Sequence, residues 1–303
     1  MKVLAFVDAR PGVGITSLLY NLATTYHGLG LKVMLVDGDP QATLSERILG
    51  SPNWEPVLWE LWNDADSSLA GALHPLLTGR SPLNICPPSE FNQLALLVGG
   101  RGLPDLEDRL AAEWATGLNA HGSAVNAGQA SLTLAISDVI RRAAELAQAQ
   151  LVLVHASPHY TSISRALVAC ADAAILTHEG DLLSILRLPQ ASVRVHDSHT
   201  TWNPAGINRT LPNFLLGHVS FQRMAGSPGG PLFPERQGLG PHLGTCHLFP
   251  SLLDLSVEMR KPEILLSPAD GALGSLGEAV RATRREFETL ARTIAERAQI
   301  ALP

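Results

Sequence analysis

A glycine-rich turn near the start of the chain is the first place where this sequence could bind a ligand. Residues 11–16 (PGVGIT) follow a short apolar run, residues 2–7, and precede a segment with helical spacing, residues 16–27. Such a turn directs several backbone N–H groups at one point, and the helix dipole adds about half a positive charge there. The sequence predicts an anion-binding site at a helix N-terminus. The alternative is a tight turn that holds no ligand.

The turn departs from the phosphate-loop pattern GxxxxGK[ST] at two positions. Gly14 and Thr16 match the second glycine and the hydroxyl residue, whereas Ala9 and Ile15 replace the first glycine and the lysine. The lysine offsets charge in phosphoryl transfer, and isoleucine offers neither a charge nor a donor. Losing one partner of a desolvated charge pair costs about 2–5 kcal/mol. This loss corresponds to roughly 30- to 3000-fold in affinity or rate.

Three segments, taken in order, resemble the ParA/MinD family of partitioning ATPases, which are SIMIBI-type P-loop proteins. Residues 10–17 (RPGVGITS), followed by 21–23 (NLA), resemble the deviant Walker A box KGGVGKTT…NLA of that family. Residues 36–41 (VDGDPQ) look like its DxDPQ segment. Residues 151–158 (LVLVHASP) resemble its Walker B strand, with His155 at the aspartate position. The resemblance covers nearly the whole chain.

This resemblance implies ATP and Mg²⁺ as cofactors and assigns roles to particular residues. Thr16 and Asp37 are implied to hold Mg²⁺, and Asp37 and Asp39 to be catalytic, because the second aspartate of the family orients the attacking water. Arg10 takes the position of the signature lysine that reaches across a dimer, although a guanidinium is not equivalent to an ammonium. The residues implied to bind the nucleotide are Arg10, Pro11, Gly12, Val13, Gly14, Ile15, Thr16 and Ser17.

The departures from the family fall on catalytic positions and leave the scaffold glycines in place. Ile15 lacks the charge of the lysine, and a neutral imidazole at His155 is a poor ligand for Mg²⁺, which prefers oxygen. This pattern predicts a pseudo-ATPase: a homodimeric partitioning or positioning switch for DNA, plasmid or cargo segregation, with weak or no ATP hydrolysis. Its expected partners are a ParB-like or other protein and, by non-specific contacts, DNA.

Two alternatives stay open. The first is a nucleotide-independent scaffold that binds its partner constitutively, in which ATP and Mg²⁺ are absent. The second is an active ATPase of the ParA type, in which Arg10 supplies the missing charge.

Apolar runs alternate with helical patterns along the chain, beginning with strand, turn, helix and strand within the first 40 residues. This order predicts an α/β fold, a doubly wound and mostly parallel twisted sheet with helices on both faces. We expect one domain over residues 1–303, with a flexible glycine- and proline-rich loop at about 225–245 before a strand at 246–250. Pro189 is expected to end or kink a helix over residues 182–195.

Two shorter segments complete the prediction, a strand at residues 83–87 and a mobile loop at 119–128. Trp54, Trp59 and Trp62 are interpreted as core or subunit-interface packing.

The predicted C-terminal helix, residues 274–299, is rich in arginine. Relatives in the ParA family bind DNA non-specifically through basic residues near the dimer surface, so this helix is a candidate DNA contact that would weaken with salt. The alternative is a solvated face on which nearby glutamates balance the arginines. The candidate DNA-binding residues are Arg281, Arg284, Arg285 and Arg292.

The composition is that of a globular protein, with 46% hydrophobic and 17% charged residues. A net charge of −6 argues against attraction of the whole molecule to nucleic acid or anionic lipid. We expect no membrane partner, because no apolar stretch reaches the ~18 residues that cross a bilayer. We expect a cytoplasmic location, because the scattered cysteines suit reduced thiols. The three cysteines are expected to be reduced, and neither they nor the eleven histidines have the spacing of a metal site.

Overall fold

An eight-stranded sheet forms the centre of the described chain, in the order β3-β4-β2-β5-β1-β6-β7-β8. Neighbouring strands are parallel except β3 and β4, which form an antiparallel pair at one edge. The structure is a computed structural model that describes residues 1–9, 12, 14–49, 55–64, 67–77, 80, 89–91, 93–119, 132–157, 160–202, 214–223 and 240–303. The strands are β1 (Lys2–Asp8), β2 (Val33–Asp37), β3 (Ser89–Phe91), β4 (Leu94–Leu97), β5 (Leu151–Ala156), β6 (Ala173–Glu179), β7 (Leu215–Arg223) and β8 (His242–Leu248).

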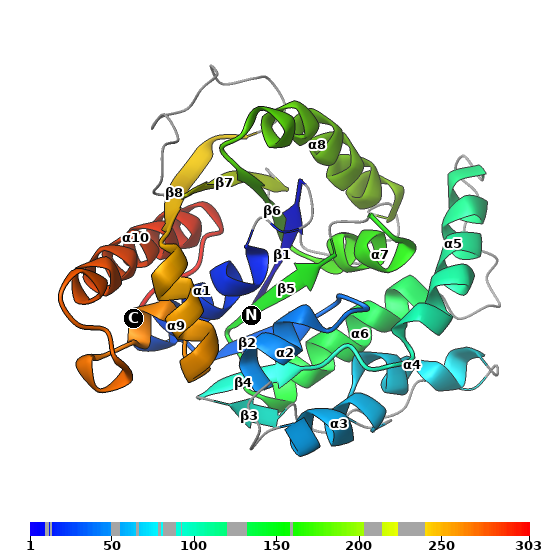
Figure 1. Cartoon of the computed structure of the whole chain (residues 1–303). Coiled ribbons are helices and arrows are strands. Elements are labelled where there is room, and N and C mark those ends of the chain that lie inside the picture. The colour runs from blue at the N-terminus through cyan, green and yellow to red at the C-terminus, as the bar shows by residue number, and fades with distance from the viewer. Residues whose placement is uncertain are drawn as a thin grey trace.

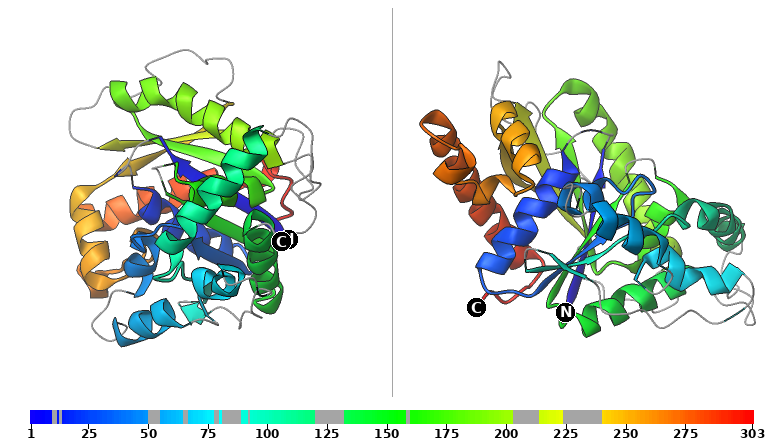
Figure 2. Two further views of the ribbon diagram at one scale, coloured as in Figure 1. Left: turned by 90° about the vertical axis from the view of Figure 1, so that its right-hand side faces the viewer. Right: turned by 60° about the horizontal axis from the view of Figure 1, so that its bottom comes forward.

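Helices cover both faces of this sheet, as Figure 1 and Figure 2 show. One apolar layer joins the sheet to α4–α8, and the other joins it to α1, α2 and α10. The helices are α1 (Ile15–Gly28), α2 (Thr43–Leu49), α3 (Glu55–Asn63), α4 (Leu69–Leu77), α5 (Leu103–Asn119), α6 (Leu132–Leu146), α7 (Ser162–Cys170), α8 (Leu182–Trp202), α9 (Pro250–Met259) and α10 (Ser275–Arg297), with short 3-10 turns η2 (Glu263–Leu265) and η3 (Pro268–Asp270). The predicted doubly wound α/β fold is confirmed.

The sequence of the central strand β1 is a continuous apolar run because both faces of the strand are buried. Val3, Ala5 and Val7 pack into the layer of α4–α8, whereas Leu4 and Phe6 pack into the layer of α1 and α10. A parallel strand buried on both faces has no solvated side, so every position favours an apolar residue.

The prediction that Pro189 ends its helix is wrong, and the alternative, a kink at Pro189, stays a prediction. Helix α8 continues from Leu182 to Trp202 with Pro189 inside it. Leu188, Ala191 and Val195 lie on both sides of the proline and are buried in the core. Burial of several apolar side chains is worth more than the roughly 3 kcal/mol that an internal proline costs, so packing keeps the helix intact.

The expected loop at 225–245 is too long at its C-terminal end. Strand β8 begins at His242, which pairs with His218 of β7. Gly244, read as part of the loop, lies inside the strand where α10 packs closely: a Cβ there would lie 3.3 Å from Leu290. A glycine in a strand can mark such a close approach as well as a loop. The rest of the predicted loop before residue 240, the strand at 83–87 and the loop at 120–128 lie outside the described residues.

Trp59 does not pack in the core. Trp59 on α3 is 71% exposed, and Trp62 is half-buried. Trp54 lies outside the described residues. Packing at a subunit interface stays a prediction for these side chains.

Two of the cysteines, Cys170 and Cys246, are free and buried, as expected for reduced thiols.

Gly38 follows β2 at a point where the backbone passes very close to β5. Its N–H donates to the carbonyl of His155 at 3.0 Å, and a Cβ at this position would lie 2.7 Å from the same oxygen. A side chain of any size therefore requires the two strand ends to separate.

We predict that Gly38→Ala lowers the free energy of unfolding by about 1–3 kcal/mol, because the added methyl group overpacks this contact. Urea denaturation measures the effect. Gly28→Ala is the matched control, since a Cβ at Gly28 meets nothing within 4 Å. Equal stability of the two variants would contradict the prediction.

Three histidines lie in a row across β6, β7 and β8. The ring nitrogens of His178 and His218 are 3.1 Å apart, and the ring centroids of His218 and His242 are 5.2 Å apart. Burial lowers the pKa of each ring. The neighbouring imidazoles lower the pKa of His218 further, to about 4. The folded row is therefore neutral at neutral pH.

The unfolded chain protonates these imidazoles near pH 6.5, and the folded chain protonates His218 only near pH 4. Unfolding therefore takes up protons in this window, and stability falls as the pH drops from about 6.5 toward 4. We predict that His218→Asn reduces the loss of stability between pH 7 and pH 5, measured by urea unfolding at both values. The exposed His74→Gln serves as control. An unchanged pH dependence in His218→Asn would refute this account.

Candidate phosphate site

A hollow lies at the carboxyl ends of β1, β2 and β5, in front of the N-terminus of α1. In open α/β sheets this is the edge where ligands bind. The structure thus brings together the glycine-rich turn, the DxD segment and the Walker B-like strand. The residues that line the hollow are Asp8, Gly12, Gly14, Ile15, Thr16, Asp39, Gln41, Thr43, His155 and Ser157.

The described part of the glycine-rich turn has the backbone of an anion-binding loop. Gly12 and Gly14 have φ angles of 83° and 100°, a left-handed conformation that glycine adopts without strain. Gly14 is the N-cap of α1, and the first turn of that helix contains no acidic residue and no side-chain cap. The first N–H groups of α1 therefore remain available at the edge of the hollow.

The other predicted nucleotide-binding residues differ in where they lie. Thr16 is half-buried and lines the hollow, whereas Ser17 is buried and lines a second, smaller hollow. Arg10, Pro11 and Val13 lie outside the described residues.

The replacement of the phosphate-loop lysine by Ile15 removes a charge and also places a buried apolar side chain at this position. Its side chain is 5% exposed and belongs to the apolar layer between the sheet and α1, together with Phe6 and Leu18. The position that carries the cation in a phosphate loop is therefore part of the core in this chain.

Asp37 lies at the end of β2 and is completely buried. Its Oδ1 accepts from the N–H of Asp39 at 3.1 Å and lies 3.3 Å from Nδ1 of His155. Its Oδ2 accepts from the N–H and the hydroxyl of Ser45, at 2.8 and 2.7 Å. A carboxylate has about four acceptor sites, so those of Asp37 are all used by the protein.

Asp39 is less fully engaged. It lines the hollow, and its two oxygens accept from the N–H of Gln41 at 3.1 Å and from the hydroxyl of Thr43 at 2.7 Å. These bonds hold the start of α2 and leave one acceptor site on each oxygen.

His155 stands beside Asp37 on β5 and is 1% exposed. Burial alone would lower the pKa of this imidazole. The hydrogen bond to Asp37 and the charges of Asp37, Asp8 and Asp39 outweigh burial and raise the pKa above its ordinary value. His155 therefore takes up a proton at a higher pH than a free histidine does.

Asp8 is a third acid of the site, and the sequence analysis missed it. It ends β1, is buried, and accepts a hydrogen bond from the hydroxyl of Thr177. Burial is the main cause that raises its pKa to about 7, helped by the charge of Asp39 and opposed by Thr177 and His155. The available signal was its position, since Asp8 is an acid directly after the apolar run at residues 2–7.

The residues expected to hold Mg²⁺ do not fit that ion as they stand. Asp37 has no acceptor site left, and His155 presents an imidazole where an oxygen ligand is needed. Among the described residues, no group of three or more His, Cys, Asp or Glu side chains could hold a metal ion. Mg²⁺ at Thr16 and Asp37 thus stays an untested prediction that the geometry does not favour.

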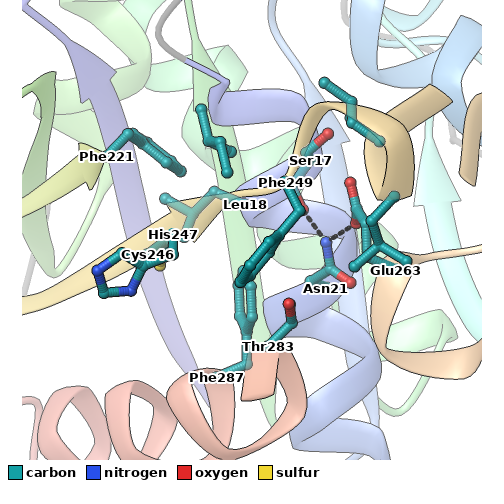
Figure 3. A pocket seen from close by; sticks show the side chains of 13 residues that line it. Ser17, Leu18, Asn21, Phe221, Cys246, His247, Phe249, Glu263, Thr283 and Phe287 are labelled. Carbon is teal, nitrogen blue, oxygen red and sulfur yellow. Dashed lines mark hydrogen bonds between the residues drawn. The ribbon is translucent and has the colours of Figure 1, made fainter. Parts of the chain in front are cut away.

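A second hollow lies between α1, the end of β8 and α10, as Figure 3 shows. Its volume of about 20 Å³ holds roughly one water molecule, which suits the unpartnered hydroxyl of Thr283 in its wall. Phe221 and Phe249 both line it. This space is too small for a base, so it is a packing defect beside the site.

A buried polar network links α1 and α2 to η2 and α9. Nδ2 of Asn21 on α1 donates to the carbonyl of Ser17 at 2.9 Å and to the carboxylate of Glu263 in η2 (Figure 3). Arg47 on α2 is 8% exposed, lies 3.5 Å from Glu263, and donates to Ser256 of α9. Two helices, α1 and α2, thus contact one carboxylate, and α9 is joined to it through Arg47.

The arginines of α10 are not one uniform surface. Arg284 donates two hydrogen bonds to the carbonyl of Ile264, at 2.6 and 3.2 Å, and so holds η2 against the helix. All four side chains are exposed, and Arg284 differs from Arg281, Arg285 and Arg292 in its bonds to η2. DNA binding by this set stays a prediction, and Arg284 has a structural role.

Comparison with solved structures places the fold. A protein from Corynebacterium diphtheriae superimposes with a TM-score of 0.69 over 98% of both chains at 14% identity. A plasmid partition protein from Borrelia burgdorferi gives 0.60 over 98% of this chain and 99% of its own at 12% identity. Cobyrinic acid a,c-diamide synthase from Mycobacterium smegmatis, solved with ADP and magnesium, gives 0.52 over 73% and 74% at 18% identity.

The described chain shares the fold of these proteins, one of which is a plasmid partition protein. The predicted resemblance is therefore confirmed at the level of the fold. No protein-family model and no curated protein matches the sequence. Within the described residues, no helix is long and apolar enough to cross a membrane.

The raised pKa of Asp8 has a consequence for stability. Between about pH 4 and pH 7 the folded protein keeps a proton on Asp8 that the unfolded chain releases near pH 3.8, so stability falls as the pH rises through this window. We predict that Asp8→Asn increases the free energy of unfolding at pH 8, by on the order of a few kcal/mol, and much less at pH 4. Chemical denaturation at both pH values tests this.

The exposed Glu60→Gln on α3 is the matched control for Asp8→Asn. A gain for Asp8→Asn that is equal at the two pH values would show that Asp8 is not a buried, protonated acid.

Proposed function

We propose that the chain is a ParA/MinD-like partition or positioning protein with a degenerate nucleotide site. It acts as a dimeric switch that binds DNA or a protein partner, with weak or no ATP hydrolysis. The observation that carries this proposal is the pairing of a retained loop with a buried Ile15. Gly12 and Gly14 keep their left-handed backbone at the N-terminus of α1, while the cationic position has become core.

The residues of the loop have distinct roles in this proposal. Backbone N–H groups around Gly12 and Gly14, the hydroxyl of Thr16 and the N-terminus of α1 bind the phosphate of ATP. Arg10 contacts the nucleotide across the dimer. Asp39 is the group that would orient a water. Hydrolysis is slow because no lysine offsets the charge that develops on the transferred phosphoryl group.

A nucleotide-independent scaffold is the second candidate function, and one observation favours it. Asp37 already bonds to His155 and Ser45, so protein contacts alone link the ends of β2 and β5. A partner surface supported by these strands would then form without ATP. In a third candidate, an active ATPase, Arg10 would supply the charge that Ile15 lacks.

Titration with ATP by calorimetry, with dimerisation followed by light scattering, distinguishes these candidates. We expect ATP binding in the micromolar to millimolar range that promotes dimerisation, with turnover near background, because backbone donors remain and the lysine is absent. A dimer that forms without ATP and binds none at millimolar concentration would establish the scaffold instead. Turnover well above background that is abolished by Asp39→Ala would establish the active ATPase.

Ile15→Lys sharpens this test. If the hollow is a phosphate site, the new ammonium restores a desolvated charge partner and tightens ATP binding by at least about tenfold. Ile15→Met is the matched control, because it has an unbranched side chain of similar length without a charge. Equal affinities in the two variants would mean that phosphate does not lie beside residue 15.

A further inference from the structure

Helix α5 holds the N-termini of two other helices with two of its carboxylates. Glu107 accepts hydrogen bonds from the first two N–H groups of α7, at 2.6 and 3.1 Å. Glu113 accepts in the same way from the first two N–H groups of α6, at 2.8 and 3.3 Å. The first N–H groups of a helix have no partner within that helix, so each carboxylate satisfies two donors that need an acceptor.

Only the cap on α7 leads to the hollow. Ser157 follows β5 and lines the hollow, whereas no described residue of α6 does so. In the first turn of α7, the hydroxyl of Ser164 donates to the carbonyl of Ser157 at 3.0 Å, and its N–H donates to the hydroxyl of Thr161 at 3.2 Å. The turn that Glu107 holds is therefore bonded directly to the wall of the hollow.

The backbone that enters α7 is strained. Tyr160 has a φ angle of 50°, a left-handed conformation that a bulky side chain disfavours. Its hydroxyl lies 3.5 Å from the carbonyl of Asp8, and the guanidinium of Arg194 lies 5.0 Å from the centre of its ring. A strained residue keeps its conformation only where the surrounding contacts hold it. The two hydrogen bonds to Glu107 begin two residues further along the chain and are among those contacts.

Glu107 is itself held in place by the packing of α5. Leu106 and Leu110 of this helix are buried in the core. Trp114 is 1% exposed, and the guanidinium of Arg165 on α7 lies 4.4 Å from the centre of its ring. Because α5 is fixed against α7 at several points, the carboxylate of Glu107 acts from a rigid support.

We infer that Glu107 is a positioning residue of the phosphate site. It fixes the first turn of α7, and through Ser164 it fixes Ser157 in the wall of the hollow. This role rests on the proposed function, because the affinity that Glu107 influences is the affinity for a nucleotide phosphate. It adds an element outside the sequence motifs, helix α5, to those that shape the site.

The variants Glu107→Ala and Glu113→Ala test this role as a matched pair. Each deprives two N–H groups of a charged acceptor at a helix N-terminus, so we expect both to lower the free energy of unfolding in urea. Only Glu107→Ala is expected to weaken ATP binding, by about threefold or more in calorimetric titration. Equal ATP affinities of the two variants would refute the positioning role.

The conservative variant Glu107→Gln separates the hydrogen bonds from the rest of the side chain. Glutamine keeps the length of the side chain and one acceptor oxygen for the N–H groups of α7. We expect its ATP affinity to lie closer to that of the wild-type protein than to that of Glu107→Ala. An affinity as low as that of Glu107→Ala would contradict a role that acts through accepted hydrogen bonds.

Amide hydrogen exchange of the wild-type protein covers the case in which these variants do not fold. Coupling between two sites is reciprocal, so saturating ATP should slow exchange at Ser162, Ile163 and Ser164 more than at Leu132 and Thr133 of α6. Unchanged exchange in α7 while ATP is bound would overturn this role of Glu107 and leave the proposed function standing. No ATP binding at millimolar concentration would overturn the proposed function, and this role with it.

Discussion

The buried pair of Asp37 and His155 is the interaction on which the site depends. It joins the carboxyl ends of β2 and β5, the two strands that flank the hollow on one side, at 3.3 Å. A charge pair removed from water is expensive to break, because the remaining partner has no other means of stabilisation. Gly38 reinforces the junction by donating to the His155 carbonyl. The protein thus holds the ends of these two strands together with its own side chains and backbone.

Much of the fold could be predicted because each buried strand is a continuous apolar run. The strands at residues 2–7 and 151–154 and the helix at 16–27 were predicted to within a few residues, and they set the parallel order. Pro189 and Gly244 misled the prediction for one shared reason. Both have strong local preferences against their observed element, and packing against neighbouring elements outweighs those preferences, which no local pattern reveals.

The candidate site could be predicted in its membership and not in its chemistry. The resemblance implied that Gly12, Gly14 and Asp39 belong to one nucleotide site, and the structure places all three at the edge of one hollow. The hydrogen bonds of Asp37 and Asp8 depend on sheet register and on two hydroxyls outside the motifs, that of Ser45 on the following helix and that of Thr177, which is 169 residues from Asp8 in sequence. A motif specifies only residue types, whereas the hydrogen bonds of the folded protein determine which side-chain atoms can still bind a ligand.

The carboxylate of Glu263 has a consequence for the rest of the molecule. Asn21 of α1 bonds to it and to the N–H of Ile264, while Arg284 of α10 bonds to the carbonyl of Ile264. Helices α1 and α10 are therefore both held by hydrogen bonds to η2, at the adjacent residues Glu263 and Ile264. A ligand that contacts the outer surface of α10 would therefore bind to a helix held by the same 3-10 turn that holds α1, the helix that follows the glycine-rich turn.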